Sequence, residues 1–196
     1  MTFKIVTNFP CHIDSYHEEV TNDRWLDAFE DADIIFALAT KDGFQKAREA
    51  KAKLSSKQIF VLEIFHVGPA LQLLASKLDE LVKGEKAFKE IRNTMMDFRG
   101  NVRSFFMLPP LLGSRKRRIG TINYEGDLIV TDLCYGENKS FTSLIDQIKY
   151  SGYHGGKILL SSKNKNLKQL LLDTFGDIQI EYISSNKQGL FIGLEL

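Results

Sequence analysis

The chain has 196 residues, of which 43% are hydrophobic and 26% charged, with a formal net charge of +1. This length suits one domain with a substantial core, and the near-neutral charge gives no general attraction to polyanions. Cys11 and Cys134 are too few for a disulfide framework, and no apolar run approaches the roughly 20 residues of a membrane span. We therefore expect a cytoplasmic protein without a membrane among its partners, and the sequence leaves its oligomeric state open.

The first half of the chain alternates predicted strands with predicted helices. Apolar and β-branched runs predict the strands, and apolar residues at helical spacing predict the helices. Strands are expected at residues 3–9, 33–39, 58–65 and 101–108, and helices near 21–29, 41–54, 71–81 and 88–98. Since almost no polar residue interrupts the third of these strands, we expect it to be buried on both faces.

The second half continues the alternation after a loop and a short edge strand at 119–124. Strands are expected at 127–133, 157–160, 178–183 and 190–194, helices at 140–150 and 167–175, and a turn at 184–189. Strands joined through helices run parallel, whereas the short final turn can join only antiparallel neighbours. The sequence therefore predicts a single α/β domain. Its sheet is Rossmann-like and mostly parallel, with helices on both faces and a C-terminal antiparallel hairpin. Residues 57–196 would form the core, and residues 1–56 a lid or extra strands.

A polar loop after the first strand, HIDSYHEE, contains two histidines and three acids within eight residues. Imidazole and carboxylate groups are ligands of zinc, manganese and iron. His12, Asp14 and His17 are therefore weak candidates for a metal site. The alternative is a solvated polar loop, because this spacing matches no metal motif.

Two segments resemble class I methyltransferases that use S-adenosylmethionine. VLEIFHVGPALQLL is similar to their first motif, in which a strand ends in an acid and a tight turn approaches the cofactor, and GDLIVTDLCY with YHGGKILL is similar to the second half of that fold. The spacing is closest to the ribose 2′-O RNA methyltransferases. The resemblance implies that Glu63, His66 and Gly68 contact S-adenosylmethionine. It also implies that Asp132 acts at the catalytic centre and contacts the cofactor. Tyr135 follows Asp132 in the same loop and is a candidate to orient the substrate or accept a proton, the alternative being that it packs over the end of the sheet.

The one dense basic run, from Arg115 through Lys116 and Arg117 to Arg118, follows Pro109 and Pro110 in the loop. Four cations in a loop can bind the phosphates of RNA or of another phosphate-bearing substrate, although such runs are often only solvated. Together with the methyltransferase resemblance, this run predicts methyl transfer to a phosphate-bearing or nucleic-acid substrate.

Two alternatives remain open at this point, so whether the protein is an enzyme is uncertain. Phe65, His66 and Val67 occupy a turn in which the methyltransferases carry glycines, which favours a non-catalytic scaffold that has lost its cofactor. ILLSSKNKNLKQLLLDTFG is similar to the C-terminal half of GNAT-type acyltransferases, but the preceding loop, CYGENKS, has only one glycine for a coenzyme pyrophosphate. The catalytic hypothesis requires Glu63 and Asp132 to lie at the same rim of one sheet.

Overall fold

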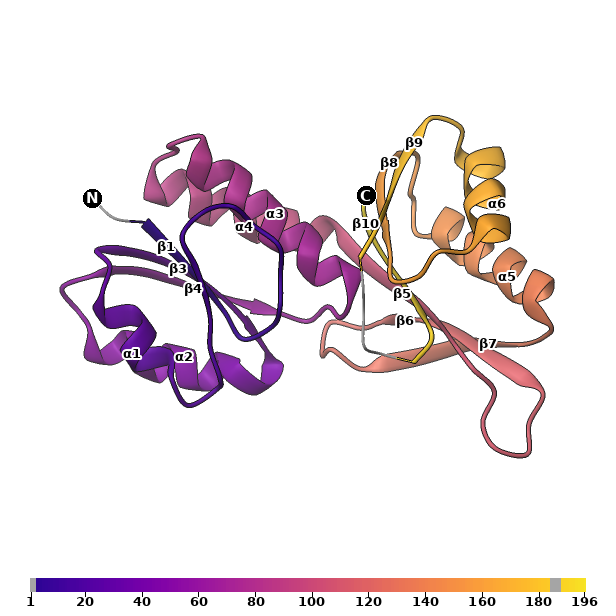
Figure 1. Ribbon diagram of the computed structural model, residues 1–196, viewed down its shortest axis with the longest axis horizontal. Coiled ribbons are helices and arrows are strands. Elements are labelled where there is room, and N and C mark those ends of the chain that lie inside the picture. The colour runs from indigo at the N-terminus through magenta and orange to yellow at the C-terminus, as the bar shows by residue number, and fades with distance from the viewer. Residues whose placement is uncertain (1–2, 184–187) are drawn as a thin grey trace. The chain divides into compact units, whose positions relative to one another are not determined.

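The computed structural model describes residues 3–183 and 188–196 and divides into two compact units (Figure 1). Unit 1 runs as far as Phe65 and includes Leu74–Gly100, and unit 2 combines His66–Leu73 with Asn101–Leu196. Each unit has its own sheet. That the whole chain forms a single domain stays a prediction, but the single continuous sheet is wrong.

Unit 1 contains a fully parallel sheet with strand order β2-β1-β3-β4. Helices α1 and α2 cover one face, and α3 and α4 lie on the other (Figure 1). Six of the seven residues of β3 are buried, as expected for a strand covered on both faces. The bounds are β1 Phe3–Thr7, β2 His17–Glu19, α1 Trp25–Glu30, β3 Ile34–Thr40, α2 Lys41–Lys53, β4 Gln58–Ile64, α3 Pro69–Lys83 and α4 Phe88–Asn101.

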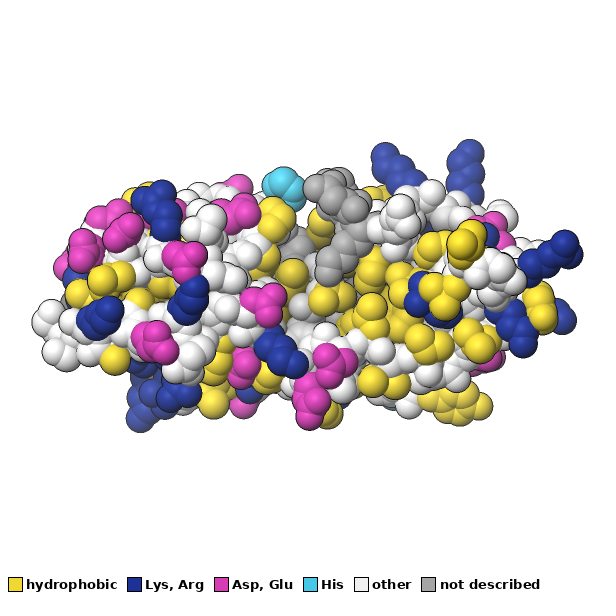
Figure 2. All heavy atoms as spheres, turned by 90° about the horizontal axis from the view of Figure 1, so that it is seen from below, with side chains coloured by type: hydrophobic (Ala, Val, Ile, Leu, Met, Phe, Trp, Pro, Cys, Tyr) yellow, Lys and Arg dark blue, Asp and Glu magenta, His cyan; other side chains and the backbone are white. Residues whose placement is uncertain are grey.

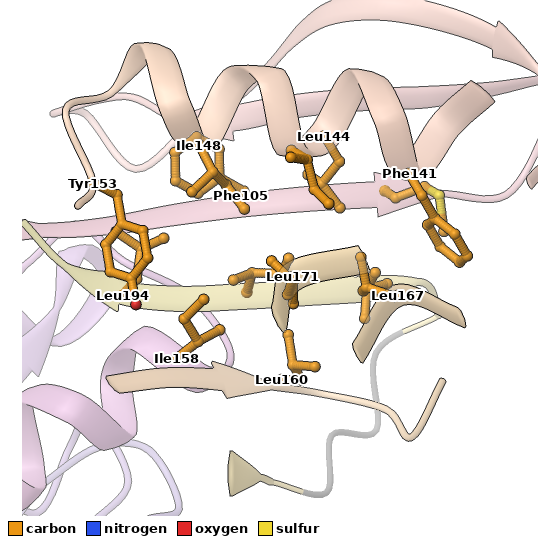
Figure 3. Close-up of a cluster of buried hydrophobic side chains, with 14 of the residues drawn as sticks. Phe105, Phe141, Leu144, Ile148, Tyr153, Ile158, Leu160, Leu167, Leu171 and Leu194 are labelled. Carbon is orange, nitrogen blue, oxygen red and sulfur yellow. The ribbon is translucent and has the colours of Figure 1, made fainter. Parts of the chain in front are cut away.

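Unit 2 contains a mixed sheet with strand order β7-β6-β5-β10-β8-β9, in which only β8 and β9 pair in parallel. Helices α5 and α6 pack on one face of it through a continuous apolar cluster (Figure 3). The bounds are β5 Val102–Leu108, β6 Lys116–Ile122, β7 Leu128–Tyr135, α5 Glu137–Tyr150, β8 Gly156–Leu160, α6 Lys165–Phe175, β9 Ile178–Tyr182 and β10 Leu190–Glu195.

The α/β class is confirmed, and every predicted helix and strand is present within a few residues, but the predicted pairing of the last two strands differs. Strand β10 is antiparallel, as expected, yet its neighbours are β5 and β8, so β9 lies at the sheet edge. Burial explains this order. Five of the six β10 residues are buried, which suits a central strand, whereas β9 is mostly half-buried. The predicted turn at 184–189 falls largely outside the described residues.

Within the part of the chain that the structure describes, no helix combines the length and the apolar character needed to cross a membrane.

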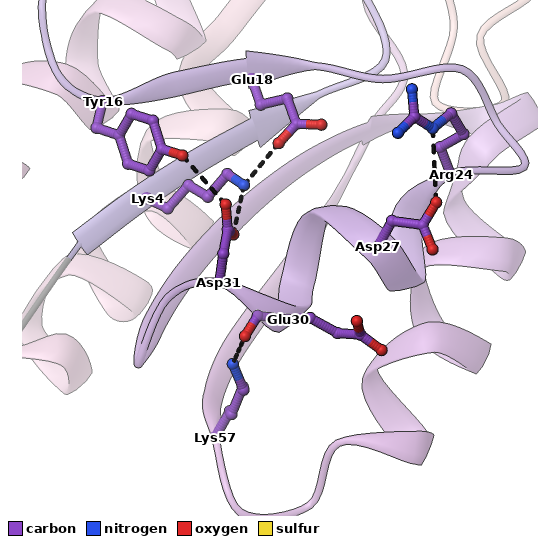
Figure 4. A network of polar contacts seen from close by, with 8 residues as sticks. All are labelled: Lys4, Tyr16, Glu18, Arg24, Asp27, Glu30, Asp31 and Lys57. Carbon is purple, nitrogen blue, oxygen red and sulfur yellow. Dashed lines mark hydrogen bonds and ion pairs between the residues drawn. The ribbon is translucent and has the colours of Figure 1, made fainter.

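A buried lysine on β1, Lys4, forms ion pairs with Glu18 on β2 and with Asp31 after α1 (Figure 4). The side chain of Lys4, on β1, is fully buried, and its Nζ lies 2.6 Å from carboxylate oxygens of both Glu18 and Asp31. Tyr16 donates a hydrogen bond of 3.1 Å to Asp31. Burial opposes the charged form of Lys4, but its hydrogen bonds to Asp31 and Glu18 raise the Lys4 pKa. The same hydrogen bond from Lys4 lowers the pKa of Asp31.

We predict that the partners of Lys4 matter more to stability than Lys4 itself. Converting Glu18 to Gln and Asp31 to Asn leaves a buried ammonium facing only amides. This should cost about 2 kcal/mol, less than the roughly 3–5 kcal/mol of a fully buried pair because both carboxylates contact water. Lys4→Met removes the charge at similar volume and should cost less than about 1.5 kcal/mol. Urea unfolding measures both, and a larger loss for Lys4→Met would contradict this account.

The stabilisation by the ion pairs of Lys4 should decrease as the pH falls. Because the pKa of Asp31 is lowered in the folded chain, its stabilisation is present above the ordinary aspartate pKa of about 3.9 and is lost as pH falls through the lowered value. The stability difference between the wild type and the Glu18/Asp31 double variant should therefore narrow below about pH 4. A constant difference down to acid unfolding would assign the effect to packing.

Candidate functional site

The two acids on which the methyltransferase hypothesis depends lie in different sheets. Glu63 is on β4 in the parallel sheet of unit 1, and Asp132 is on β7, an edge strand of unit 2 that pairs antiparallel with β6. All eight residues of β7 except Cys134 are exposed, so it is not the buried core strand that the resemblance requires. The predicted common rim of one sheet is therefore wrong.

Protein side chains occupy the turn that was expected to hold a cofactor. In unit 1, Arg99 lies 5.2 Å over the ring of Phe65 and donates a 3.0 Å hydrogen bond to the carbonyl of Glu63. In unit 2, His66 Nδ1 lies 3.1 Å from Ser104 Oγ. Gly68 has the positive φ expected of a glycine turn, 59°, but a Cβ there would meet Phe191 at 3.2 Å. This glycine allows the turn to pack against β10.

The carboxylate of Asp132 is engaged by its own neighbours. Ser143 donates to it at 2.6 Å, Cys134 at 3.2 Å and the Leu133 backbone N–H at 2.7 Å. These hydrogen bonds, that of Ser143 foremost, lower the Asp132 pKa and make it a weaker base. Tyr135 is exposed, with Lys116 Nζ 5.1 Å from its ring centroid. This geometry favours a local polar network over proton transfer.

The weak metal candidates do not converge on one point. His17 Nε2 lies 2.9 Å from Thr7 Oγ1 and 3.5 Å from Cys11 Sγ, and burial lowers the His17 pKa. Asp14 instead forms a 2.7 Å ion pair with Lys83, and His12 is exposed. Among residues 3–183 and 188–196, no three or more histidine, cysteine or acidic side chains gather in a way that could hold a metal ion.

A cavity of about 280 Å³ in unit 2, which we call the helix-end cavity, combines apolar and polar walls. It lies where β5, β6 and β10 meet the first residues of α5 and the segment that leads into α6. Its lining residues come from all of these elements: Met107, Pro109, Arg117, Glu137, Phe141, Ser162, Asn164, Gly189 and Leu190.

The apolar wall of this cavity continues into the core of unit 2. Met107, Phe141 and Leu190 belong to the cluster between the sheet and the two helices, and Figure 3 shows Phe141 and Leu167 at the same end of that cluster. A hydrocarbon chain that entered here would meet the largely apolar side chains of this cluster beyond the mouth. The wall therefore suits an aliphatic group.

The polar wall suits an anion. Among the described residues, the guanidinium of Arg117 has no hydrogen bond or ion pair, so it is available to a ligand. Residues Glu137 and Asn164 mark the N-terminal ends of α5 and α6, where backbone N–H groups and helix dipoles favour negative charge. Glu137 is the one acid in the wall. A carboxylate beside Arg117 would gain charge-assisted hydrogen bonds.

The four cations of the basic run from Arg115 to Arg118 lie in different surroundings. Arg117 faces the helix-end cavity, Lys116 lies over Tyr135, and Arg115 is exposed in the loop. Arg118 Nε is buried without a hydrogen-bond partner among the described residues. Alternation along β6 causes this separation, because successive side chains point to opposite faces. That alternation was the signal that could have singled out Arg117.

We predict that Asn164 stabilises α6 and with it one end of the cavity. Its side chain accepts a 3.0 Å hydrogen bond from the Leu167 backbone N–H, as an N-cap residue does. Asn164→Ala should lower the free energy of unfolding by about 1 kcal/mol. Asn166→Ala, inside the same helix and exposed, is the matched control and should not destabilise, since alanine is the better helix former. Equal losses in both variants would exclude the capping role.

The chain is similar in sequence to two DegV domain-containing proteins. No protein-family model matches the chain. A DegV domain-containing protein of Streptococcus gordonii is 24% identical over 212 residues, covering 89% of this chain and 75% of that protein. A DegV domain-containing protein of Streptococcus pneumoniae is 23% identical with the same coverage.

Solved structures match along the whole chain. The fatty acid kinase (Fak) B3 protein of Streptococcus pneumoniae, loaded with linoleic acid, has a TM-score of 0.86 at 18% identity, covering 100% of this chain and 99% of that one. A DegV family protein from Eubacterium eligens, loaded with heptadecanoic acid, has a TM-score of 0.85 at 17% identity, covering 99% of each. At these identities the likeness shows the fold.

These comparisons correct the functional predictions. The relatives are DegV domain proteins, and the structures of the same fold hold fatty acids, so the methyltransferase and GNAT-type acyltransferase hypotheses are wrong. S-adenosylmethionine is likewise wrong as the cofactor, and RNA or a phosphate-bearing compound as the substrate. The physical reason is that the strand-turn-helix patterns of the two halves belong to two separate sheets, whereas the methyltransferase hypothesis requires both at the rim of one sheet.

Proposed function

We propose that this chain is a DegV-type protein that binds a long-chain fatty acid. The observation that carries the proposal is the likeness along the whole chain to two proteins whose structures contain linoleic and heptadecanoic acids. The helix-end cavity supports it, because a fatty acid needs a cationic site for its carboxylate beside an apolar path for its tail, and this cavity has both.

In this proposal the carboxylate pairs with Arg117, and the tail extends along Met107, Phe141 and Leu190. A volume of about 280 Å³ is just below the usual range of ligand pockets, roughly 300 to 1,000 Å³. It suffices for the head and the first part of the chain. The rest of the tail requires α5 or α6 to shift outward from the sheet, which would open the apolar cluster along its length.

The proposed role is non-catalytic, as in the scaffold alternative, but with a ligand of a different kind. One structural neighbour is named as a protein of fatty acid kinase, so chemistry on the bound acid would belong to a partner. The free cysteines Cys11 and Cys134 support a reducing, cytoplasmic location for this role.

The proposal is tested by titrating the delipidated protein with linoleic and heptadecanoic acids and by mass spectrometry of lipids extracted from the purified chain. Arg117→Gln should weaken binding at least about 10-fold, because a hydrogen bond to a charged group contributes roughly 1.5–3 kcal/mol. Arg115→Gln removes the same charge from an exposed loop position and should leave the affinity nearly unchanged. Absence of saturable binding in the wild-type protein would overturn the proposal.

A second pair of variants tests whether the fatty acid binds in the helix-end cavity. Ser162 is exposed and lines the cavity, so Ser162→Trp should fill its mouth and reduce fatty-acid binding without disturbing the core. Lys163→Trp adds the same bulk one residue further on, at an exposed position outside the lining, and should bind as the wild type does. If both tryptophan variants bind normally, the acid occupies another site.

A further inference from the structure

A tyrosine hydroxyl lies inside the apolar cluster of unit 2 without a hydrogen-bond partner. Tyr153, in the segment between α5 and β8, is 2% exposed, and its Oη is buried and unpaired among the described residues. Its ring packs edge to face with Phe175, with the ring centroids 5.1 Å apart. Burial raises the pKa of Tyr153 to about 12, so the phenol is neutral at ordinary pH. The hydroxyl can therefore both donate and accept a hydrogen bond.

The surroundings of this hydroxyl are unsuited to a buried water molecule. Such a water typically makes about three hydrogen bonds to polar groups. The other buried members of the cluster are Phe, Met, Leu and Ile residues, whose side chains carry no hydroxyl, amide or charged group. An unpaired polar group in such a place opposes folding. A ligand that brings its own hydroxyl into the cluster would remove this cost.

The Tyr153 hydroxyl lies at the end of the cluster that is far from the helix-end cavity. Figure 3 shows Tyr153 with Ile158 and Leu194 at one end and Phe141 at the other. The sheet gives the same order, because Leu190 lines the cavity and Leu194, opposite Ile158, lies further along β10. The four residues from Leu190 to Leu194 span roughly 13 Å of an extended strand.

This distance corresponds to the middle of a long acyl chain. With carbon–carbon bonds of about 1.5 Å, an extended zigzag advances roughly 1.3 Å per carbon, so about ten carbons span roughly 13 Å. A carboxylate paired with Arg117 at the cavity would therefore place roughly the tenth to twelfth carbons beside Tyr153.

We propose that the site selects long-chain fatty acids that carry a hydroxyl group near the middle of the chain, and that Tyr153 recognises this hydroxyl. The inference rests on the proposed fatty-acid function and on the path of the tail through the cluster. The ligand hydroxyl and the phenol form one hydrogen bond, and no covalent bond changes. An unsubstituted tail leaves the phenol unpaired, and a hydroxyl group that meets another part of the cluster is itself buried without a partner.

Adsorption of the acid on the protein surface would give a different result. Figure 2 shows hydrophobic side chains gathered on the surface of unit 2, and Ile129, Val130 and Leu133 of β7 are exposed. Such side chains can hold an acyl chain. In contact with water they give little preference for one hydroxyl position, because water satisfies the hydroxyl equally well at any carbon. Dependence of the affinity on the hydroxyl position therefore identifies binding in the interior.

The test compares three acids of equal length by titration of the delipidated full chain: octadecanoic acid, 2-hydroxyoctadecanoic acid and 12-hydroxyoctadecanoic acid. The wild type should bind the 12-hydroxy acid about 5-fold more tightly than octadecanoic acid, because one net hydrogen bond is gained. The 2-hydroxy acid keeps its hydroxyl at the cavity mouth and should bind within about 2-fold of octadecanoic acid. Tyr153→Phe should reverse the preference, binding the 12-hydroxy acid about 5-fold less tightly than octadecanoic acid, since the ligand hydroxyl is then unpaired.

Tyr150→Phe is the matched control, because Tyr150 ends α5 at a position that is 91% exposed. This variant should keep the wild-type preference. Equal binding of the three acids by the wild type, or an unchanged preference in Tyr153→Phe, would overturn the selection of a hydroxyl and leave the fatty-acid function standing. If the wild type binds none of the three acids, both inferences fail.

Urea unfolding without ligand gives a second readout that does not depend on fatty acids. Tyr153→Phe removes a buried hydroxyl that has no partner, so it should raise the urea midpoint by roughly 0.5 M. A lower midpoint would show that the hydroxyl is already paired within the folded chain, and it would overturn the assignment of Tyr153 to a ligand.

Discussion

The apolar cluster between the sheet of unit 2 and helices α5 and α6 is the constraint on which the rest of that unit depends. Strand β10 lies at the centre of the sheet, with Leu190, Ile192 and Leu194 all pointing into the cluster. Because both helices pack on this one face, their N-terminal ends meet the sheet at the same edge of the cluster. The burial that stabilises the unit therefore also places Arg117 and the N-terminal ends of the two helices beside an apolar interior.

Unit 1 is stabilised both by apolar strands and by the ion pairs of a buried lysine. Strands β1, β3 and β4 are largely apolar and mostly buried, but Lys4 places a fully buried cation on β1, where the carboxylates of Glu18 and Asp31 neutralise it. These contacts join β1 to the short strand β2 and to the end of α1. Local polar pairing thus supports parallel strands whose register is set by apolar packing.

The two segments that resemble methyltransferases share local structure with that fold but lie in separate sheets. A strand that ends in an acid, a tight turn and a helix occur in many α/β proteins, so the motif reports local geometry and leaves the ligand unspecified. In this chain the turn after β4 is filled by Phe65 and His66, and Asp132 lies on an exposed antiparallel edge strand. The proposed acid-binding cavity instead uses Arg117 with two helix ends.

The sequence by itself determined the α/β class, the helices and nearly all of the strands, because hydrophobic periodicity and glycine or proline breaks act over a few residues. The exception was β2, whose three residues, His17–Glu19, are too few and too polar to give a pattern. Only the tertiary structure decided that the strands form two sheets, that β10 lies between β5 and β8, and that Arg117 alone of its basic run lines a cavity. Strand partners are chosen by burial among residues far apart in the chain, which short-range patterns do not encode.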